Sequence, residues 1–137
     1  MKLEVSEVIG RPAAAVFDFV GFKHVANHPR WDLMLQLEQV TDGPIGVGTV
    51  IRRRHTHFGE PMDGVMECVE FDPPRAIGFA IHDGPMEITG RMSVEPEGPD
   101  RSVLTITADM PGMDGPLDPR PVEESARRIK QLVESEG

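Results

Sequence analysis

The chain has 137 residues, of which 39% are hydrophobic and 27% charged, a length and composition typical of one globular domain. Its 14 Lys and Arg residues against 23 Asp and Glu give a formal net charge of −9, which disfavours nucleic acid and anionic membranes as partners. A single cysteine excludes an internal disulfide and a thiolate metal cluster.

The first elements predicted along the chain are a strand and two short helices. Apolar and polar residues alternate through residues 3–9, which is typical of a strand. Three alanines follow Pro12, and a proline in the first turn is compatible with a helix that alanines favour. Gly21 interrupts this helix, and a second short helix is expected over residues 22–27, ended by Pro29.

From Trp31 onward the hydrophobic period is two, which predicts a series of strands. One face of the first of them carries Trp31, Leu33, Leu35 and Leu37. Turns rich in Gly, Pro and Asp separate five further predicted strands, at residues 47–58, 62–71, 76–82, 86–95 and 102–110. The regular alternation in 86–95 indicates an antiparallel sheet with one covered face.

The C-terminal segment predicts a long amphipathic helix. A loop rich in Gly and Pro is expected at 111–116, and Asp118 can cap the helix that follows. Apolar residues then recur every three or four positions, at Val122, Ala126, Ile129 and Val133. The expected fold is therefore α+β, with a curved antiparallel sheet of six to seven strands, two short helices after the first strand, and this helix against the concave face.

Four segments also carry a family resemblance: EVIGRPAAAVFDFV at 7–20, PRWD at 29–32, GVGTVIRRR at 46–54 and VEFDPPRAIGF at 69–79. In this order, over essentially the whole chain, they resemble the polyketide cyclase/dehydrase and lipid-transport family of the START-like (SRPBCC, Bet v 1-like) superfamily. The resemblance implies a helix-grip fold with a deep, largely apolar pocket between the sheet and the C-terminal helix. It implies no particular reaction, because the superfamily contains carriers, receptors, cyclases, hydrolases and regulators.

The strand predicted at 47–58 carries the main candidate for chemistry. His55 and His57 are two residues apart and so point to the same side, together with Arg53. If that side faces the pocket, Arg53 can bind a carboxylate or a polyketide oxyanion, and the histidines can move protons. The opposite register turns Val50, Arg52, Arg54, Thr56 and Phe58 inward, and the sequence leaves both registers open.

The alternative, without a functional role, is that the histidines are exposed near a turn. The arginines would then be edge charges that keep sheets from associating. A metal site would need more ligands than His55 and His57, and only His82 follows them in the sequence. We therefore expect no metal and no other cofactor.

A set of apolar residues is expected to line the pocket: Trp31, Leu33, Leu35, Ile51, Phe79, Met86, Ile88 and Met92. The alternative is that Trp31 and the methionines only fill the core. Glu67 shares a strand face with Val65 and Val69. Facing inward, Glu67 would be a buried carboxylate and a candidate general base, and facing outward it would be a surface charge.

Three functions follow from the sequence. The first is binding of a small hydrophobic ligand, such as a lipid, a polyketide or an aromatic molecule. The second is a cyclase or dehydratase in which Arg53 steadies an oxyanion while His55, His57 or Glu67 moves the proton. The third is a protein-interaction module of the stress-response or toxin type.

Location and assembly follow from simpler patterns. There is no run of about 18 apolar residues and no apolar signal-peptide core, so we expect residues 1–137 to form one cytoplasmic domain without membrane insertion. An open edge of the sheet would allow a homodimer.

Overall fold

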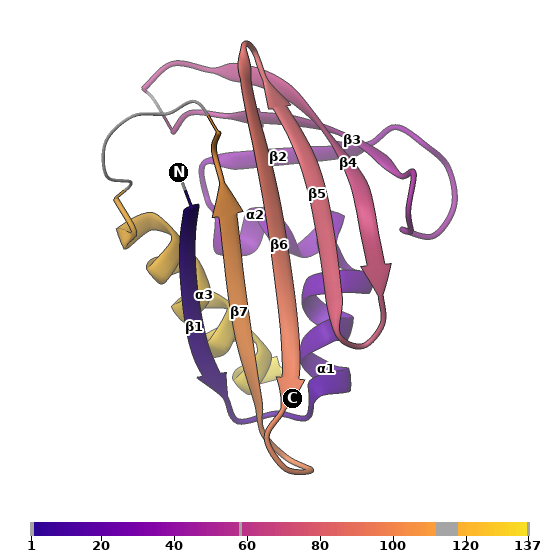
Figure 1. Cartoon of the computed structure of the whole chain (residues 1–137), viewed down its shortest axis with the longest axis vertical. Coiled ribbons are helices and arrows are strands. Elements are labelled where there is room, and N and C mark those ends of the chain that lie inside the picture. The colour runs from indigo at the N-terminus through magenta and orange to yellow at the C-terminus, as the bar shows by residue number, and fades with distance from the viewer. Residues whose placement is uncertain (1, 58, 112–117, 137) are drawn as a thin grey trace.

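A computed structural model describes residues 2–57, 59–111 and 118–136. Its seven strands form one antiparallel sheet with the helices gathered on one side (Figure 1). The strands are β1 (Lys2–Ile9), β2 (Leu35–Gln39), β3 (Val50–His55), β4 (Met62–Asp72), β5 (Ala76–Asp83), β6 (Met86–Pro96) and β7 (Ser102–Asp109). Their order in the sheet is β1-β7-β6-β5-β4-β3-β2. Strands β2 to β7 therefore lie beside their neighbours in sequence, and β1 pairs with β7 as the edge strand opposite β2. The expected α+β fold is confirmed.

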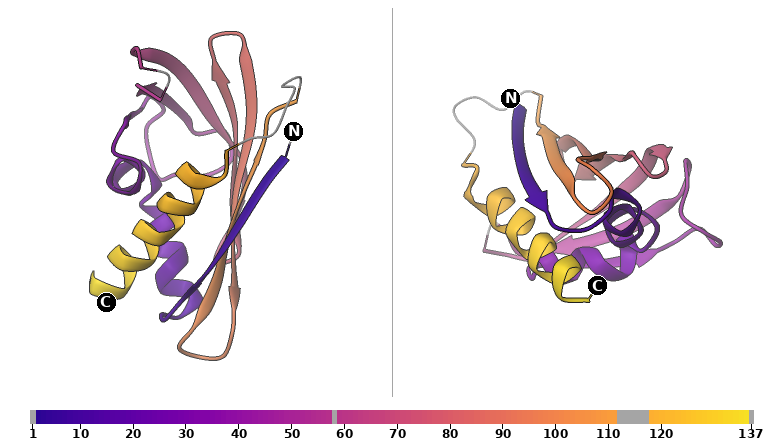
Figure 2. Two further views of the ribbon diagram at one scale, coloured as in Figure 1. Left: turned by 90° about the vertical axis from the view of Figure 1, so that its left-hand side faces the viewer. Right: turned by 90° about the horizontal axis from the view of Figure 1, so that it is seen from below.

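The long helix α3 (Arg120–Glu136) crosses the concave side of the sheet (Figure 2). Ala126, Ile129 and Val133 are buried, as their helical spacing predicts. Two polar contacts fix the helix to the end of β1: the Lys130 ammonium donates to the carbonyl of Val8 at 2.9 Å, and the Gly10 amide donates to the Glu134 carboxylate at 2.8 Å. None of the described helices has both the length and the apolar character needed to cross a membrane.

Three short helical segments connect β1 to β2: α1 (Ala13–Phe17), a π-helical turn η1 (Asp18–Phe22) and α2 (His24–Trp31). The prediction that Pro29 ends the second helix is wrong, because α2 runs through Pro29 to Trp31. A proline within a helix removes one backbone hydrogen bond. Burial of the Trp31 indole against Phe19, with ring centroids 5.8 Å apart, offsets that loss.

The strand predicted to start at Trp31 therefore begins too early in the prediction. Trp31 is the last residue of α2 rather than part of a strand, and Leu33 lies in the following turn with 70% of its surface exposed. The strand starts only at Leu35, which is buried. The prediction that Trp31, Leu33 and Leu35 share a strand face is thus wrong, because helix burial of the tryptophan overrides the alternation of the sequence.

The register of β3 is now defined. Ile51, Arg53 and His55 are buried on the concave face, whereas Arg52 and Arg54 are exposed on the convex face. The strand ends at His55, short of the predicted 47–58, so His57 follows it in the connection to β4. Phe58 and, apart from Pro111, the loop predicted at 111–116 lie outside the described residues.

The convex face of β4 carries Glu67. Its neighbours on that face, Val65 and Val69, are exposed, and Met66 and Cys68 between them are buried on the concave side. Glu67 is itself exposed, which is the outward alternative for this carboxylate. From the convex face the Glu67 carboxylate cannot reach the concave face of the sheet.

Candidate functional site

Three buried polar side chains meet on the concave face, and we call Arg53, His55 and Asp83 the inner cluster. Asp83, the last residue of β5, joins the other two: one carboxylate oxygen lies 3.0 Å from Nε of Arg53 and the other 2.9 Å from Nε2 of His55. Arg53 is 7% exposed, and His55 and Asp83 are each 1% exposed. Polar and charged groups so well buried need partners, and Asp83 provides one for Arg53 and one for His55.

Gly64 makes this arrangement possible. It lies on β4 between the two strands, paired with Arg53 on one side and with Asp83 on the other. A Cβ atom at this position would overlap the Asp83 carboxylate and would come within 2.7 Å of the carbonyl of His82. Because Gly64 has no side chain, the Asp83 carboxylate has room to extend across β4 and contact Arg53 and His55 on β3.

Both ring nitrogens of His55 are engaged inside the protein. Nε2–H donates to Asp83, since a carboxylate accepts, and Nδ1 accepts from the backbone N–H of His57 at 3.4 Å. The ring also stacks on that of His57, with centroids 4.5 Å apart. These contacts hold His55 in one orientation and position the start of the connection that carries His57.

A second acid–histidine pair lies at the rim of the cluster, and we call His57 and Asp32 the rim pair. Nε2 of His57 lies 2.9 and 3.1 Å from the two carboxylate oxygens of Asp32. The side chains are 33% and 21% exposed, so solvent and small molecules reach them. Burial raises the pKa of Asp32, but the hydrogen bond and charge of His57 outweigh it and hold that pKa below its ordinary value.

Two histidines on α2 face the same region. Nδ1 of His24 donates to the carbonyl of Val20 at 2.8 Å, and Nε2 of His24 lies 3.0 Å from Nδ1 of His28. Burial and the charge of Arg53, only partly offset by the bond to Val20, lower the pKa of His24 to about 4. Burial, His24 and Arg53 likewise put the pKa of His28 well below its usual range. Both rings are thus neutral at pH 7.

The guanidinium of Arg53 has unused hydrogen-bonding capacity. Its Nε and the nearby Asp83 oxygen form an ion pair without the alignment of a hydrogen bond. Its two terminal nitrogens form no hydrogen bond to any residue in the described part of the chain. Burial lowers the pKa of Arg53, although the charges of Asp83 and Asp32 oppose this. The side chain stays cationic and can donate to an oxygen atom placed beside it.

Half-buried apolar side chains border the inner cluster on the concave face, and we call Met62, Met86 and Ile88 the apolar strip. Met62 pairs with His55 across β3 and β4, and Met86 pairs with Asp83 across β5 and β6. All three are partly accessible, unlike the core beneath them. An apolar surface and a buried cation thus lie next to each other.

The predicted lining residues occupy three environments. Five are buried in the interior, namely Trp31, Leu35, Ile51, Phe79 and Met92. Met86 and Ile88 belong to the apolar strip, and Leu33 is exposed. Of the predicted catalytic candidates, Arg53 and His55 meet in the inner cluster, His57 lies at its rim, and Glu67 is on the other face of the sheet.

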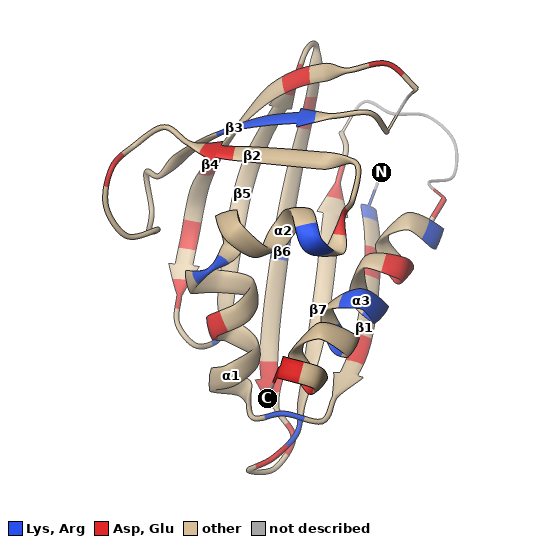
Figure 3. Ribbon diagram, turned by 180° about the vertical axis from the view of Figure 1, so that it is seen from behind, with Lys and Arg blue, Asp and Glu red and all other residues tan. Residues whose placement is uncertain are grey.

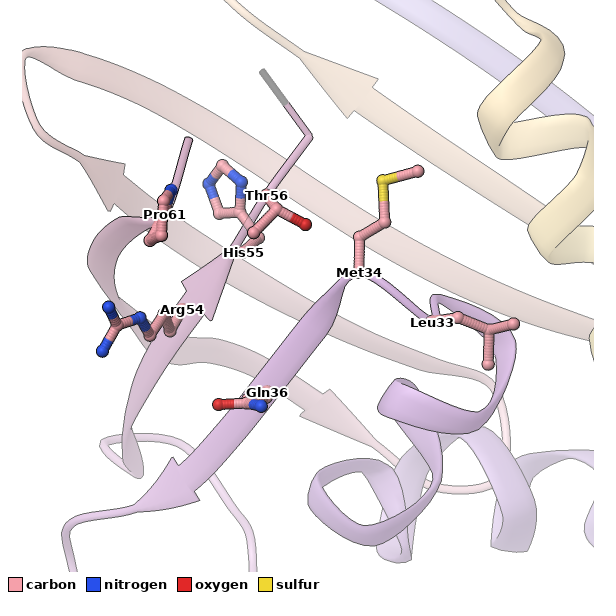
Figure 4. A pocket seen from close by; sticks show the side chains of 7 residues that line it. All are labelled: Leu33, Met34, Gln36, Arg54, His55, Thr56 and Pro61. Carbon is pink, nitrogen blue, oxygen red and sulfur yellow. The ribbon is translucent and has the colours of Figure 1, made fainter. Parts of the chain in front are cut away.

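A separate pocket of about 180 Å³ lies at the edge where β2 begins and β3 ends (Figure 4). Its lining residues are Leu33, Met34, Gln36, Arg54, His55, Thr56 and Pro61. Gln36 and Arg54 belong to the convex face, so this pocket approaches His55 from outside the concave side. The described residues contain no group of three or more His, Cys, Asp or Glu side chains placed to hold a metal ion.

Sequence reasoning missed Asp83, Asp32, His24 and His28. The sequence predicts Asp83 in a turn, because Gly and Pro follow it, and predicts Asp32 on a strand. The His24 and His28 spacing of four residues is the signal that could have found the α2 pair, because residues four apart share a helix face.

Comparisons with known proteins agree with this fold. A family model described as polyketide cyclase/dehydrase and lipid transport matches residues 1–136. The Zhui aromatase/cyclase from Streptomyces sp. R1128 superposes with a TM-score of 0.79 at 15% identity, covering 98% of this chain and 93% of that one. Norcoclaurine synthase from Thalictrum flavum gives 0.76 at 15% identity, over 99% and 95% of the two chains. Ginseng major latex-like protein 151 from Panax ginseng gives 0.76 at 15% identity, over 99% of this chain and 96% of that one.

At these identities the solved structures establish the fold alone. No curated protein matches the sequence. Together the family model and the structures fit a Bet v 1-like fold of the kind used for ligand binding or for cyclase chemistry.

Proposed function

Because this chain belongs to the polyketide cyclase/dehydrase and lipid-transport family, we propose that it binds one small, largely apolar molecule on the concave face of its sheet. An oxygen atom of that molecule is held by Arg53. The single observation that carries the proposal is the buried Arg53 guanidinium, whose terminal nitrogens form no hydrogen bond within the described part of the chain. A hydrogen bond from a guanidinium to a ligand oxygen is charge-assisted, so an oxygen atom placed beside these nitrogens would be bound favourably.

Charge balance selects the kind of oxygen. Asp83 already neutralises Arg53, and Asp32 lies close enough to affect the pKa of Arg53. A ligand carboxylate would add a further negative charge beside these two acids in a protein whose net charge is −9. The site therefore favours a neutral acceptor, such as the carbonyl oxygen of an aromatic ketone or of a polyketide.

The apolar strip supports a hydrophobic body for the same ligand. Met62, Met86 and Ile88 are half-buried beside the inner cluster, and covering them removes apolar surface from water. Methionine side chains adapt to ligands of different shapes. A flat aromatic molecule with one carbonyl group satisfies both parts of the site.

The test uses 2-acetonaphthone, a neutral aromatic ketone, and measures its affinity by calorimetry together with its effect on thermal unfolding. Wild-type protein is expected to bind it and to unfold at a higher temperature in its presence. Arg53→Lys keeps the charge but removes the guanidinium fork. We expect this variant to weaken binding about fivefold or more, since a hydrogen bond to a charged group is lost or distorted.

Arg52→Lys is the matched control. Arg52 is the preceding residue of β3, is exposed, and pairs with Glu38 at 3.3 Å on the convex face. The Arg52→Lys variant should bind the ketone as tightly as the wild type does. Native mass spectrometry of freshly purified protein, before and after denaturation, adds a search for a retained organic molecule. If 2-acetonaphthone and a panel of aliphatic and aromatic ketones all fail to bind, or if Arg53→Lys and Arg52→Lys behave alike, the proposal is wrong.

A second candidate function is proton transfer on such a ketone, and the rim pair favours it. Asp32 holds His57 through Nε2–H, which leaves Nδ1 of His57 as the basic nitrogen, and Nδ1 forms no hydrogen bond within the described residues. Nδ1 would take a proton from the carbon next to the carbonyl. The electron pair of that C–H bond would form the enolate double bond, and the charge on oxygen would be held by Arg53.

Hydrogen–deuterium exchange at the methyl group of 2-acetonaphthone in D₂O, followed by NMR, measures this step. An enzyme of this kind should exchange these protons faster than buffer, and His57→Gln should reduce the rate by about 100-fold or more. His82→Gln is the control, because His82 is exposed on β5 and paired only loosely with Glu87 at 3.9 Å. Exchange no faster than in buffer would leave a binding protein without this activity.

A further inference from the structure

The two histidines of α2 form a hydrogen-bond chain with a fixed direction. The chain starts at the carbonyl of Val20, which can only accept, so Nδ1 of His24 must carry a proton. A neutral ring has one N–H, so Nε2 of His24 is an acceptor, and the proton between the rings belongs to Nδ1 of His28. Nε2 of His28 is then left as an unprotonated acceptor at the end of the chain.

The surroundings keep both rings in this state and in place. His24 is 2% exposed, and its ring packs against Phe79 with centroids 4.6 Å apart. The ring of His28 stacks on Trp31 at 4.9 Å and is nearly parallel to it. A proton added to either ring would lie in a buried region that Arg53 already makes positive, which is why both pKa values are lowered.

The free acceptor is accessible. His28 is only half-buried, and its Nε2 forms no hydrogen bond to any residue in the part of the chain that the structure describes. The helix α2 that carries it lies over the concave face beside β2 (Figure 3). The charge of Arg53 acts on His28, so a donor and an acceptor from two different elements lie in the same region.

We propose that Nε2 of His28 accepts a hydrogen bond from a hydroxyl group of the ligand, so that the site selects molecules carrying both a carbonyl oxygen and a separate phenolic or enolic hydroxyl. The inference rests on the proposed binding function and narrows its ligand class. A hydroxylated aromatic ketone satisfies both ends, whereas the corresponding methyl ether offers no proton to His28. An amine cation is disfavoured, since it would lie close to the Arg53 charge.

The test compares each hydroxy compound with its methyl ether, which has similar shape but no donor. The probes are the 5-, 6- and 7-hydroxy-2-acetonaphthones and their methyl ethers, so that three carbonyl-to-hydroxyl spacings are sampled. At least one hydroxy isomer should bind wild-type protein about fivefold more tightly than its ether, the value of one uncharged hydrogen bond. His28→Phe keeps an aromatic ring against Trp31 and should remove the preference.

A second measurement does not depend on the folding of a variant. Histidine ¹⁵N NMR of the wild-type protein should show Nε2 of His28 without a proton in the free state, and its resonance should move upfield when the preferred hydroxy ketone binds. A shift of the same size with the methyl ether would contradict a hydrogen bond from the hydroxyl.

The outcomes separate the two proposals. If hydroxy ketones and ethers bind equally well for every isomer, and Arg53→Lys weakens both, the role of His28 is wrong while the binding function stands. If none of the ketones binds, the proposed binding function fails and the inference fails with it. A preference for hydroxyl that survives in His28→Phe would also overturn the role of His28.

Discussion

Asp83→Asn is expected to lower the free energy of unfolding by about 3–5 kcal/mol, the usual loss when one partner of a buried ion pair is removed. The substitution preserves the shape of the side chain but takes away its charge. Arg53, 7% exposed, then keeps a buried positive charge with no compensating acid in contact, and His55 loses the carboxylate that accepts from its Nε2. Urea unfolding of the wild type and the variant measures the difference.

Two further variants show that the charge pair causes this loss. Asp63→Asn removes an exposed acid that pairs with Arg54 at 3.8 Å on the convex face, and it should leave stability unchanged within error. The double variant Arg53→Met with Asp83→Leu removes both charges and should recover much of the lost stability. Equal losses for Asp83→Asn and Asp63→Asn would show that the inner cluster does not depend on the Asp83 charge.

Gly64→Ala changes no charge and acts on the same cluster. Its new methyl group overlaps the Asp83 carboxylate, so the carboxylate must leave Arg53 and His55 or β4 must shift. The variant should therefore be destabilised by itself. Combined with Asp83→Ala, it should cost less than the sum of the two single losses, since the overlap with the carboxylate is then absent and only the close approach to the His82 carbonyl remains.

The sheet and the long helix could be predicted because hydrophobic period follows directly from backbone geometry. Alternation along β6 and the stripe of Ala126, Ile129 and Val133 on α3 are properties of short segments, and the structure confirms them. The register of β3 could not be predicted. Three consecutive arginines offer cations to both faces, and the choice depends on Asp83, which reaches Arg53 only because β4 has a glycine between them.

The rest of the candidate site depends on contacts between distant segments. Local signals put the end of α2 before Pro29, whereas the burial of Trp31 that overrides them involves Phe19, twelve residues away. Asp32 pairs with a histidine 25 residues away, which no local pattern indicates. A site assembled from α2, β3 and β5 is therefore visible in the sequence only as separate polar residues.

Acid is expected to destabilise the protein well before its carboxylates are protonated, and His24 is the main cause. Its pKa is about 4 in the folded protein and near its ordinary value of 6.5 in the unfolded chain. Between these two values the unfolded chain binds a proton that the folded protein does not. Stability is therefore complete above pH 6.5 and falls as the pH is lowered toward 4, by up to about 1.4 kcal/mol per pH unit and about 3 kcal/mol in all. His28, whose pKa is also lowered, acts in the same direction.

Urea unfolding between pH 7.5 and 4.5 measures the effect. Between pH 6.5 and 5 histidines titrate while most carboxylates stay ionised, so this range reports mainly on the histidines. The Asn side chain of His24→Asn does not titrate. The slope of its unfolding free energy against pH should therefore be smaller than that of the wild type, by the amount that corresponds to about one bound proton. His82→Asn, at an exposed position, should keep the slope of the wild type. If His24→Asn and the wild type lose stability in parallel, His24 is not kept neutral by burial. The fixed hydrogen-bond direction from Val20 through His24 to His28 would then lose its basis, because a charged ring can donate from both nitrogens.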